Sequence, residues 1–123
     1  MADKITTVGL NSVAEMIGGL EVRIYDQLAV GTDTTSASVG DTTLGSELTT
    51  ANLARVTGTV STTTANIIQL QHTWTASASA AITECGVLNV HTATGILLAH
   101  SDFSAINVDS GDSIQITYKV TVS

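Results

Sequence analysis

The chain has no proline, a single cysteine and few aromatic residues, and each shortage limits what it can be. Cys85 has no second cysteine to pair with, which excludes an intrachain disulfide. Aromatic residues make up only 3% of the chain, so a core has to be built from Val, Ile, Leu and Ala. Without proline, only the glycines mark strong turns in the polar stretches.

Charged residues are also scarce, at 12% of the chain and with a formal net charge of −7. The only basic residues, Lys4, Arg23, Arg55 and Lys119, are scattered along the sequence. Because phosphate binding requires a basic patch, we expect no nucleic-acid partner. Low charge together with a positive mean hydropathy favours burial of outer surface against other copies or a partner. The alternative is a soluble monomer kept apart by its acidic charge.

No apolar run approaches the length needed to span a bilayer, so we expect no membrane partner. Residues 1–7 lack the basic start and apolar run of a signal peptide, which favours residence or assembly in a cytoplasm. At 123 residues, the chain is expected to form one domain around a single core.

Residues 12–17 carry the only helical pattern. Asn11 or Ser12 would cap this helix, Glu15 stands at capping-box spacing from Ser12, and the pair of glycines at 18–19 would end it. A helix of about two turns does not form alone, so it has to pack on the body or on a neighbour.

Period-two alternation of apolar and polar residues predicts strands along the rest of the chain. Abundant β-branched Thr suits a pleated surface. The predicted strands are residues 20–25, 53–60, 67–75, 82–90, 96–100 and 114–122, with a hairpin loop at 91–95 and a turn at 109–112. The fold class predicted is all-β, an antiparallel β-sandwich of jelly-roll type with one short N-terminal helix. Residues 1–19 are predicted to form an N-terminal arm and residues 20–123 the sandwich.

The residues that could carry chemistry do not form a recognisable pattern. His72, His91 and His100 match no closed zinc spacing, although the last two could face each other across the predicted hairpin. Cys85 next to Glu84 could act as a nucleophile with a histidine nearby, but a free cysteine within a strand is usually a small buried hydrophobe. We therefore expect no catalytic, metal-binding or cofactor-binding residues.

Two further positions have a structural and a functional interpretation. Asp33 and Asp41 lie in the long polar stretch 31–47, but they lack the compact ligand spacing of a calcium loop, which favours solvated turn residues. Trp74 is the single tryptophan, and a buried core position is favoured over a carbohydrate platform.

A series of motifs covering residues 21–123 resembles virion structural modules of tailed bacteriophages. It begins with Gly31-Thr-Asp-Thr-Thr, Asp41-Thr-Thr-Leu and Glu47, and continues with an Arg-containing strand around Arg55 and a Trp-containing strand around Trp74. An Ile82-Thr-Glu-Cys-Gly strand, a Leu-Ala segment ending at Phe103 and a closing Gly111-Asp-Ser-Ile-Gln-Ile-Thr-Tyr strand follow. Asp33, where glycine is common, and Cys85 depart from the pattern.

The resemblance implies a virion structural module, found both in capsid decoration proteins and in fibres. A sequence of 123 residues without shaft repeats or heptads favours a capsid decoration (cement) protein that binds the outer surface of the major-capsid lattice and stabilises the shell. The resemblance also implies a homotrimer on the virion, assembled in the host cytoplasm, with the major capsid protein as partner. A receptor- or glycan-binding tip module of a tail or head fibre is the alternative.

The apolar residues of the N-terminal stretch are the predicted partner contacts: Ile5, Val8, Leu10, Val13, Met16 and Ile17. The alternative is that this stretch folds back and covers one end of its own sandwich.

Overall fold

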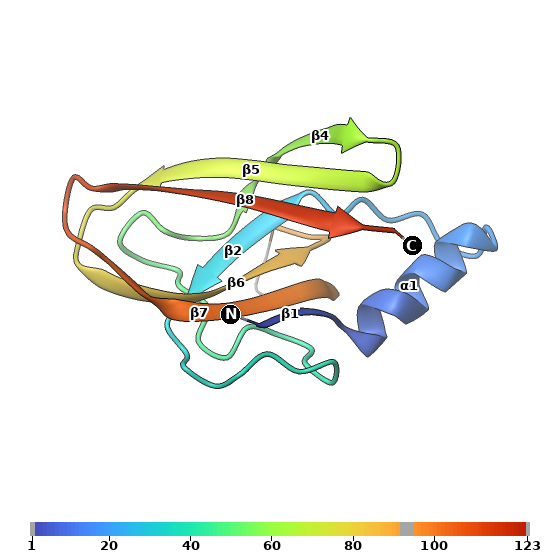
Figure 1. Cartoon of the computed structure of the whole chain (residues 1–123), viewed down its shortest axis with the longest axis horizontal. Helices are drawn as coiled ribbons and strands as arrows, with labels where there is room; N and C mark the ends of the chain where they lie inside the picture. Colours follow the sequence, from blue (N-terminus) through green and yellow to red (C-terminus); the bar gives the residue numbers. More distant parts are fainter. Residues whose placement is uncertain (1, 92–94, 123) are drawn as a thin grey trace.

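Antiparallel pairing joins the strands of the computed structural model, which describes residues 2–91 and 95–122, into two sheets. Sheet A has the order β1-β7-β6-β2-β3 and sheet B the order β4-β5-β8. The two sheets lie face to face as layers, with the single helix α1 at one end (Figure 1). The elements are β1 (Ala2–Ile5), α1 (Thr7–Ile17), β2 (Gln27–Gly31), β3 (Val56–Thr57), β4 (Thr59–Thr64), β5 (Ile67–Thr75), β6 (Ala80–Leu88), β7 (Leu97–Val108) and β8 (Ser113–Thr121). This confirms the all-β class with antiparallel sheets.

Sheet B follows the alternation in its sequence. β5 and β8 pair without a shift from Ile67 opposite Thr121 to Thr75 opposite Ser113. Leu70 and Trp74 of β5 are buried, and in β8 Ile114 and Tyr118 are buried, while the residues between these positions are more exposed. One face of each strand therefore packs on sheet A, as period-two patterning requires.

The core between the sheets is mainly aliphatic, as the shortage of aromatic residues predicts. Leu28, Val30, Leu53, Ile82 and Val87 are fully buried there. Trp74 is confirmed as a buried core residue. Its indole Nε1–H donates a hydrogen bond of 3.0 Å to the Ala54 carbonyl, so the polar atom of the ring is satisfied.

The predicted strand 53–60 is interrupted, because the chain passes from sheet A to sheet B at Gly58, between β3 and β4. The last strand is one residue earlier than predicted, whereas β7 runs eight residues beyond the predicted 96–100. Gly95 and Gly111 have φ of 107° and 93°, which agrees with the turns predicted around them. Residues 92–94 of the predicted hairpin loop lie outside the described residues.

The helix begins earlier than the sequence pattern indicated. Thr6, rather than Asn11 or Ser12, is the N-cap, and its Oγ1 accepts a hydrogen bond of 3.0 Å from the Gly9 amide. The same hydroxyl donates to the carbonyl of Leu97 on β7, so tertiary contact selects this cap. Ser12 is buried inside α1, and the predicted capping box with Glu15 is wrong. Gly18 and Gly19 end the helix as predicted.

Residues 20–25 do not form the predicted strand and lie outside both sheets. Two of their side chains are instead bound to the helix, since Arg23 Nη1 and Tyr25 Oη both donate to Ser12 Oγ, over 2.9 and 2.5 Å. The three alternate apolar side chains, Leu20, Val22 and Ile24, are exposed.

Both elements of the N-terminal stretch contact the chain's own sandwich. β1 pairs with β7 from Ala2 opposite Asp102 to Ile5 opposite Ala99. α1 also packs on β7, at Gly9, where an added Cβ would lie 2.7 Å from the Leu98 carbonyl oxygen and 2.8 Å from Leu98 Cα. Glycine therefore permits the close approach of helix and strand at this position.

We predict that Gly9→Ala destabilises the protein by about 1–3 kcal/mol, although alanine favours helix, because α1 has to move away from β7. Gly18→Ala is the matched control, since its Cβ would have only ordinary contacts at 3.6 Å and beyond. Denaturant unfolding of both variants measures the difference. Equal stability of the two variants would show that the approach at Gly9 is not constrained.

Candidate functional site

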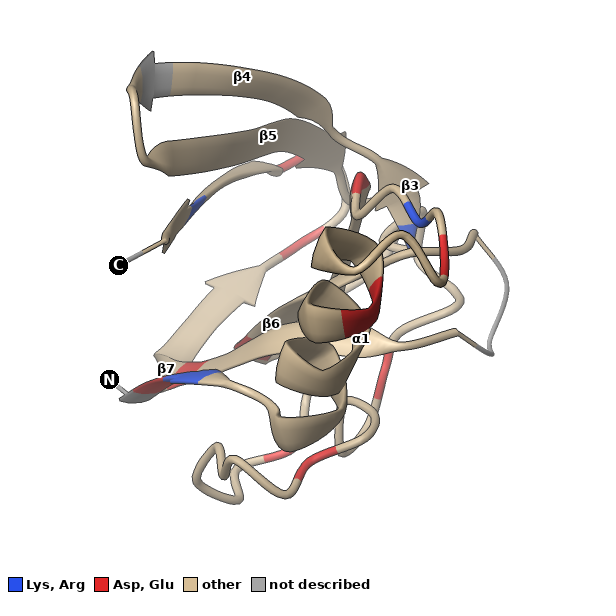
Figure 2. Cartoon of the chain, turned by 90° about the vertical axis from the view of Figure 1, so that its right-hand side faces the viewer, with Lys and Arg blue, Asp and Glu red and all other residues tan. Residues whose placement is uncertain are grey.

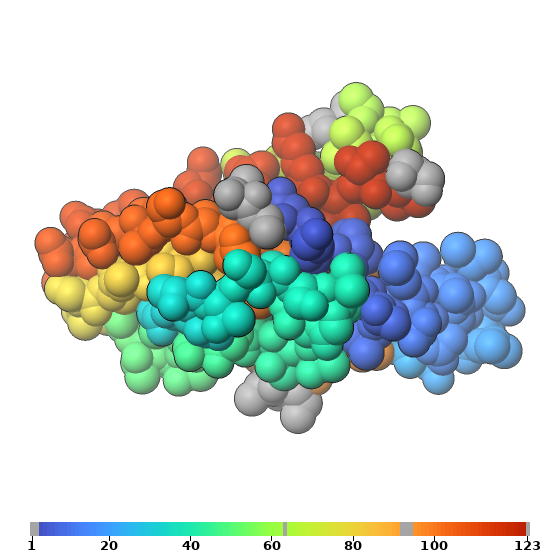
Figure 3. Space-filling view, turned by 60° about the horizontal axis from the view of Figure 1, so that its bottom comes forward, coloured from blue at the N-terminus to red at the C-terminus, as the bar shows by residue number. Residues whose placement is uncertain are grey.

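The 31–47 loop covers the outer face of sheet A, and a buried carboxylate holds it there (Figure 3). Glu84 lies in the middle of β6 and is only 1% exposed. Its Oε2 accepts hydrogen bonds from the amides of Asp33 and Ser46, over 3.0 and 2.8 Å, and its Oε1 accepts one from the Gly45 amide over 2.9 Å. One side chain therefore binds both ends of the loop.

His100 of β7 completes this cluster and links it to the middle of the loop. Its Nε2 lies 2.8 Å from Glu84 Oε1, and its Nδ1 lies 2.7 Å from Asp41 Oδ2. The hydrogen bond with Glu84, helped by Asp41, raises the pKa of His100 despite the opposing effect of burial. Burial alone would raise the pKa of Glu84, but hydrogen bonds from His100 and the three amides together lower it. The cluster therefore favours a protonated imidazole between two carboxylates.

Further contacts fix the loop along its length. At its end, Glu47 accepts from Arg55 Nε and Nη2, over 2.9 and 2.6 Å, in a paired arrangement. Arg55 is itself buried and donates through Nη1 to the Val90 carbonyl. Near the middle, the Thr7 amide donates to the Val39 carbonyl over 2.7 Å. The loop is thus a third layer of the folded body, and its Thr and Ser side chains form much of the outer surface.

The three histidines lie in separate environments. His72 packs edge-on against Trp74, with ring centroids 4.8 Å apart, and His91 Nδ1 lies 3.0 Å from Gln27 Oε1. Neither shares a partner with His100. Among the described residues, no group of three His, Cys, Asp or Glu side chains is arranged to hold a metal ion.

Cys85 is separated from the histidine cluster by the sheet itself. Glu84 and His100 face the loop, whereas Cys85 faces sheet B and lines a groove with Ser101 and Tyr118. Burial, reinforced by the charge of Asp3, raises the pKa of the thiol to about 12. Cys85 is therefore a buried, protonated thiol, in agreement with the prediction of a small buried hydrophobe, and no histidine is among the described residues that line its groove.

Asp33 and Asp41 line one hollow of about 270 Å³, which is formed by residues of the loop together with His100. Asp33 Oδ1 accepts from the amide and hydroxyl of Thr35, and Asp41 Oδ2 accepts from the Ser38 amide and faces His100. Asp33 therefore acts as a turn residue, whereas Asp41 is more than the expected solvated turn residue, because its carboxylate also pairs with His100 of β7.

The six predicted contact residues do not share one surface. Leu10 and Ile17 on α1 are 57% and 83% exposed. Ile5 lies in β1 and packs against the core, while Val8, Val13 and Met16 are partly buried. Together with the apolar side chains that follow the helix, Leu10 and Ile17 give this end of the molecule its exposed apolar surface. Their role as partner contacts stays a prediction.

Sequence reasoning missed the cluster of Glu84, His100 and Asp41. A glutamate inside the apolar run of β6 is a signal, because a buried charge requires partners. The partners themselves lie 16 and more residues away in sequence, and nothing in the local pattern identifies them.

No protein-family model matches the sequence, and neither does any curated protein. None of the described helices is long and apolar enough to cross a membrane.

We predict that stability is greatest between about pH 4.5 and 6.5 and falls on both sides. The pKa of Glu84 is lowered from 4.5, so the stability from its charged form is present above that value and is lost as the pH falls through its folded-state pKa. The pKa of His100 is raised from 6.5, so the stability from the imidazolium is present below that value and is lost as the pH rises through its folded-state pKa. Thermal unfolding measured across this range tests the profile. In His100→Asn the decline on the alkaline side should be reduced.

Replacing the central carboxylate should release the loop. Glu84→Gln places an amide where three backbone N–H groups and His100 converge, and we expect a loss of about 3 kcal/mol or more. Glu15→Gln, which changes a partly exposed carboxylate of α1 that lies 3.6 Å from Arg23, is the control and should change stability by about 0.5 kcal/mol or less. Denaturant unfolding and amide exchange of residues 33–46 measure both. Unchanged exchange in Glu84→Gln would show that other contacts hold the loop.

Proposed function

We propose that this protein is a structural assembly module, a capsid decoration protein of a tailed bacteriophage that binds the outer surface of the major-capsid lattice. The single observation that carries the proposal is the exposed apolar surface of α1, with Leu10 and Ile17 largely in solvent. Soluble proteins usually cover such surface with a partner. The motif resemblance supplies the class of partner.

Binding in this proposal is driven by burial of apolar surface, which contributes roughly 25 cal/mol per Å² before the costs of association. α1 is suited to this role, because β1 and the cap at Thr6 fix it to the sandwich. A helix that is already ordered loses little further entropy when it docks. Leu10 and Ile17 are the two predicted contact residues that are free to bury new area.

The proposal includes two finer statements, a jelly-roll type of sandwich and a homotrimer over a symmetry point of the shell. The resemblance supports both, and the low charge of the chain supports self-association. If the apolar end is not the contact, the outer surface of the 31–47 loop is the next candidate.

We predict that Ile17→Asp and Leu10→Asp weaken binding to phage shells by at least tenfold, because each would bury an unpaired carboxylate. Val60→Asp, at an exposed position of β4, is the matched control and should bind as the parent does. Cosedimentation with shells that lack the protein measures the affinity, and circular dichroism checks the fold.

Electron microscopy of particles carrying the protein distinguishes the two phage functions. Density on the capsid lattice agrees with decoration, whereas density at the end of a tail or head fibre favours the tip module. Full occupancy by Ile17→Asp and Leu10→Asp would exclude the α1 end as the contact.

A further inference from the structure

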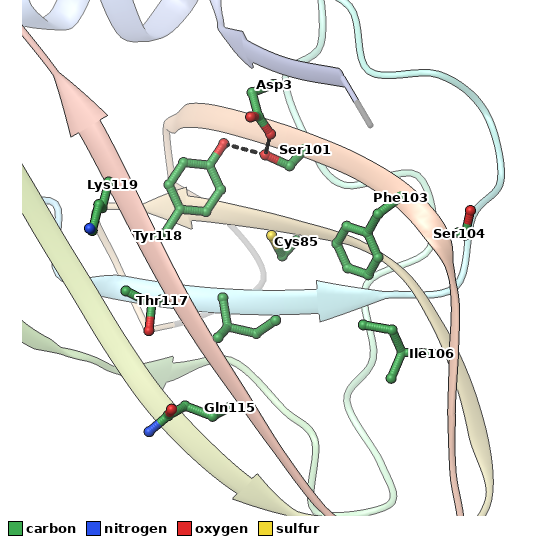
Figure 4. A pocket seen from close by; sticks show the side chains of 11 residues that line it. Asp3, Cys85, Ser101, Phe103, Ser104, Ile106, Gln115, Thr117, Tyr118 and Lys119 are labelled. Carbon is green, nitrogen blue, oxygen red and sulfur yellow. Dashed lines mark hydrogen bonds between the residues drawn. The ribbon is translucent and has the colours of Figure 1, made fainter.

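The two sheets differ in width, and the difference leaves a groove along one side of the sandwich. Sheet A has five strands and sheet B three, and β8, at the edge of sheet B, packs over β7. β1 lies beyond β7 on this side, with no described strand of sheet B above it. The groove has a volume of about 600 Å³, and Cys85, Phe103 and Ile106 lie in it between β8 and β7 (Figure 4).

The edge of β8 that borders this groove lacks the usual protection. β8 pairs with β5 over nine residues without irregularity, and within the described strands nothing pairs with its other side. It contains no proline and only one charge, on Lys119. By contrast, β4 has a register shift between Thr62 and Thr64, and the edge strands of sheet A, β1 and β3, have four and two residues. Regular, nearly uncharged edges pair readily with another strand.

A segment with the properties of that missing strand is present elsewhere in the chain. Residues 20–25 alternate apolar and polar side chains, and Val22 is 92% exposed. Within the described residues, the backbone N–H and C=O groups of residues 21–25 form no hydrogen bond with another backbone group. Arg23 and Tyr25 are bound to Ser12 on α1, which turns Leu20, Val22 and Ile24 outward as a row.

We propose that residues 20–25 of one copy add as a strand to the free edge of β8 in a second copy. The backbone groups of both segments then pair, and the added strand supplies the fourth strand of sheet B above β1. Leu20, Val22 and Ile24 point into the groove toward Phe103 and Ile106, since alternate residues share a face of a strand.

The charges of β8 and of residues 20–25 favour this pairing. Lys119 lies on the outer face of β8, and it is the only charge on that strand. In the added strand, Glu21 lies on the face opposite to the apolar row and so reaches the same outer face as Lys119. Arg23 remains bound to Ser12 and Glu15 of its own helix, with Glu15 at 3.6 Å, and does not oppose Lys119. Glu21 lies 3.9 Å from Arg23 within its own copy and would lie between Arg23 and Lys119 in the pairing.

The geometry excludes two simpler arrangements. Within one chain, the segment after α1 lies across the helix from the end of β8, so it does not reach its own groove (Figure 2). Direct pairing of β8 with β8 of a second copy would bring the two β1 strands, each beyond β7, into one space. The contact is therefore head-to-tail, and such contacts close into rings when the rotation permits. It concerns self-association alone and does not depend on binding to a shell.

Two complementary variants test the contact with purified protein. Val22→Asp places a charge in the apolar row of the added strand, in the copy that we call the donor. Ile106→Asp places a charge in the groove of the copy that receives the strand, the acceptor, at a residue that is 44% exposed. We expect each variant alone to be monomeric by sedimentation velocity, with self-association weakened by roughly a hundredfold or more. An equimolar mixture retains one intact donor and one intact acceptor, and should form a one-to-one dimer that does not grow.

Val39→Asp, at an exposed valine of the 31–47 loop, is the control and should assemble as the parent does. If Ile106→Asp does not fold, Lys119→Glu and Glu21→Lys replace it. Each should weaken association by roughly threefold to tenfold, and their combination should restore it. Amide exchange should slow in residues 21–25 and β8 on assembly, but not in β4.

Three results would overturn the inference. One is a parent chain that is monomeric at its highest soluble concentration, and another is a Val22→Asp variant that assembles like the parent. The third is a mixture of Val22→Asp and Ile106→Asp that stays monomeric while the parent assembles. Loss of shell binding by Ile17→Asp with unchanged self-association would leave this contact intact, so the two proposals fail separately.

Discussion

The carboxylate of Glu84 determines where the 31–47 loop lies. It accepts hydrogen bonds from amide N–H groups at both ends of that loop and pairs with the imidazole of His100 on β7. A buried carboxylate without such donors would be strongly destabilising, so strand and loop depend on each other. With the loop in place, the middle of sheet A is covered on both faces, by the loop on one side and by sheet B on the other. β6 is accordingly buried at every position from Ile82 to Leu88 rather than at alternate ones.

The strands that could be predicted best are those with one covered face. β5 coincides with the predicted residues 67–75, and β8 is displaced by one residue, because alternation records a single packed face. The start of α1 could not be read in this way. Thr6 is selected as the N-cap by its hydrogen bond to Leu97, a residue distant in sequence, so the local pattern does not indicate it. The position of Glu84 inside an apolar strand indicates that it needs a buried partner, but the sequence does not identify that partner.

Residues 20–25 are a different kind of discrepancy. Their pattern is that of a strand, yet they are bound to α1 mainly through polar side chains, Arg23 and Tyr25 to Ser12 and Arg23 also to Glu15. Local preference and tertiary structure usually agree in natural proteins, and disagreement concentrates at functional positions. The narrow sheet B and this unpaired segment are the two parts of the contact that we propose between copies, which would cover the exposed apolar side chains of residues 20–24.

The loop is held mainly through main-chain groups, and this separates its shape from its chemistry. The exposed side chains of Thr34, Ser36, Thr42 and Thr43 form none of the bonds to Glu84. A Cβ at Gly31 would collide with the Glu84 carboxylate, so that position admits little else. Homologous chains can thus vary the exposed side chains of the 31–47 loop while its backbone keeps the same course. Such chains would share Gly31 and the buried Glu84 rather than the exposed side chains of the loop.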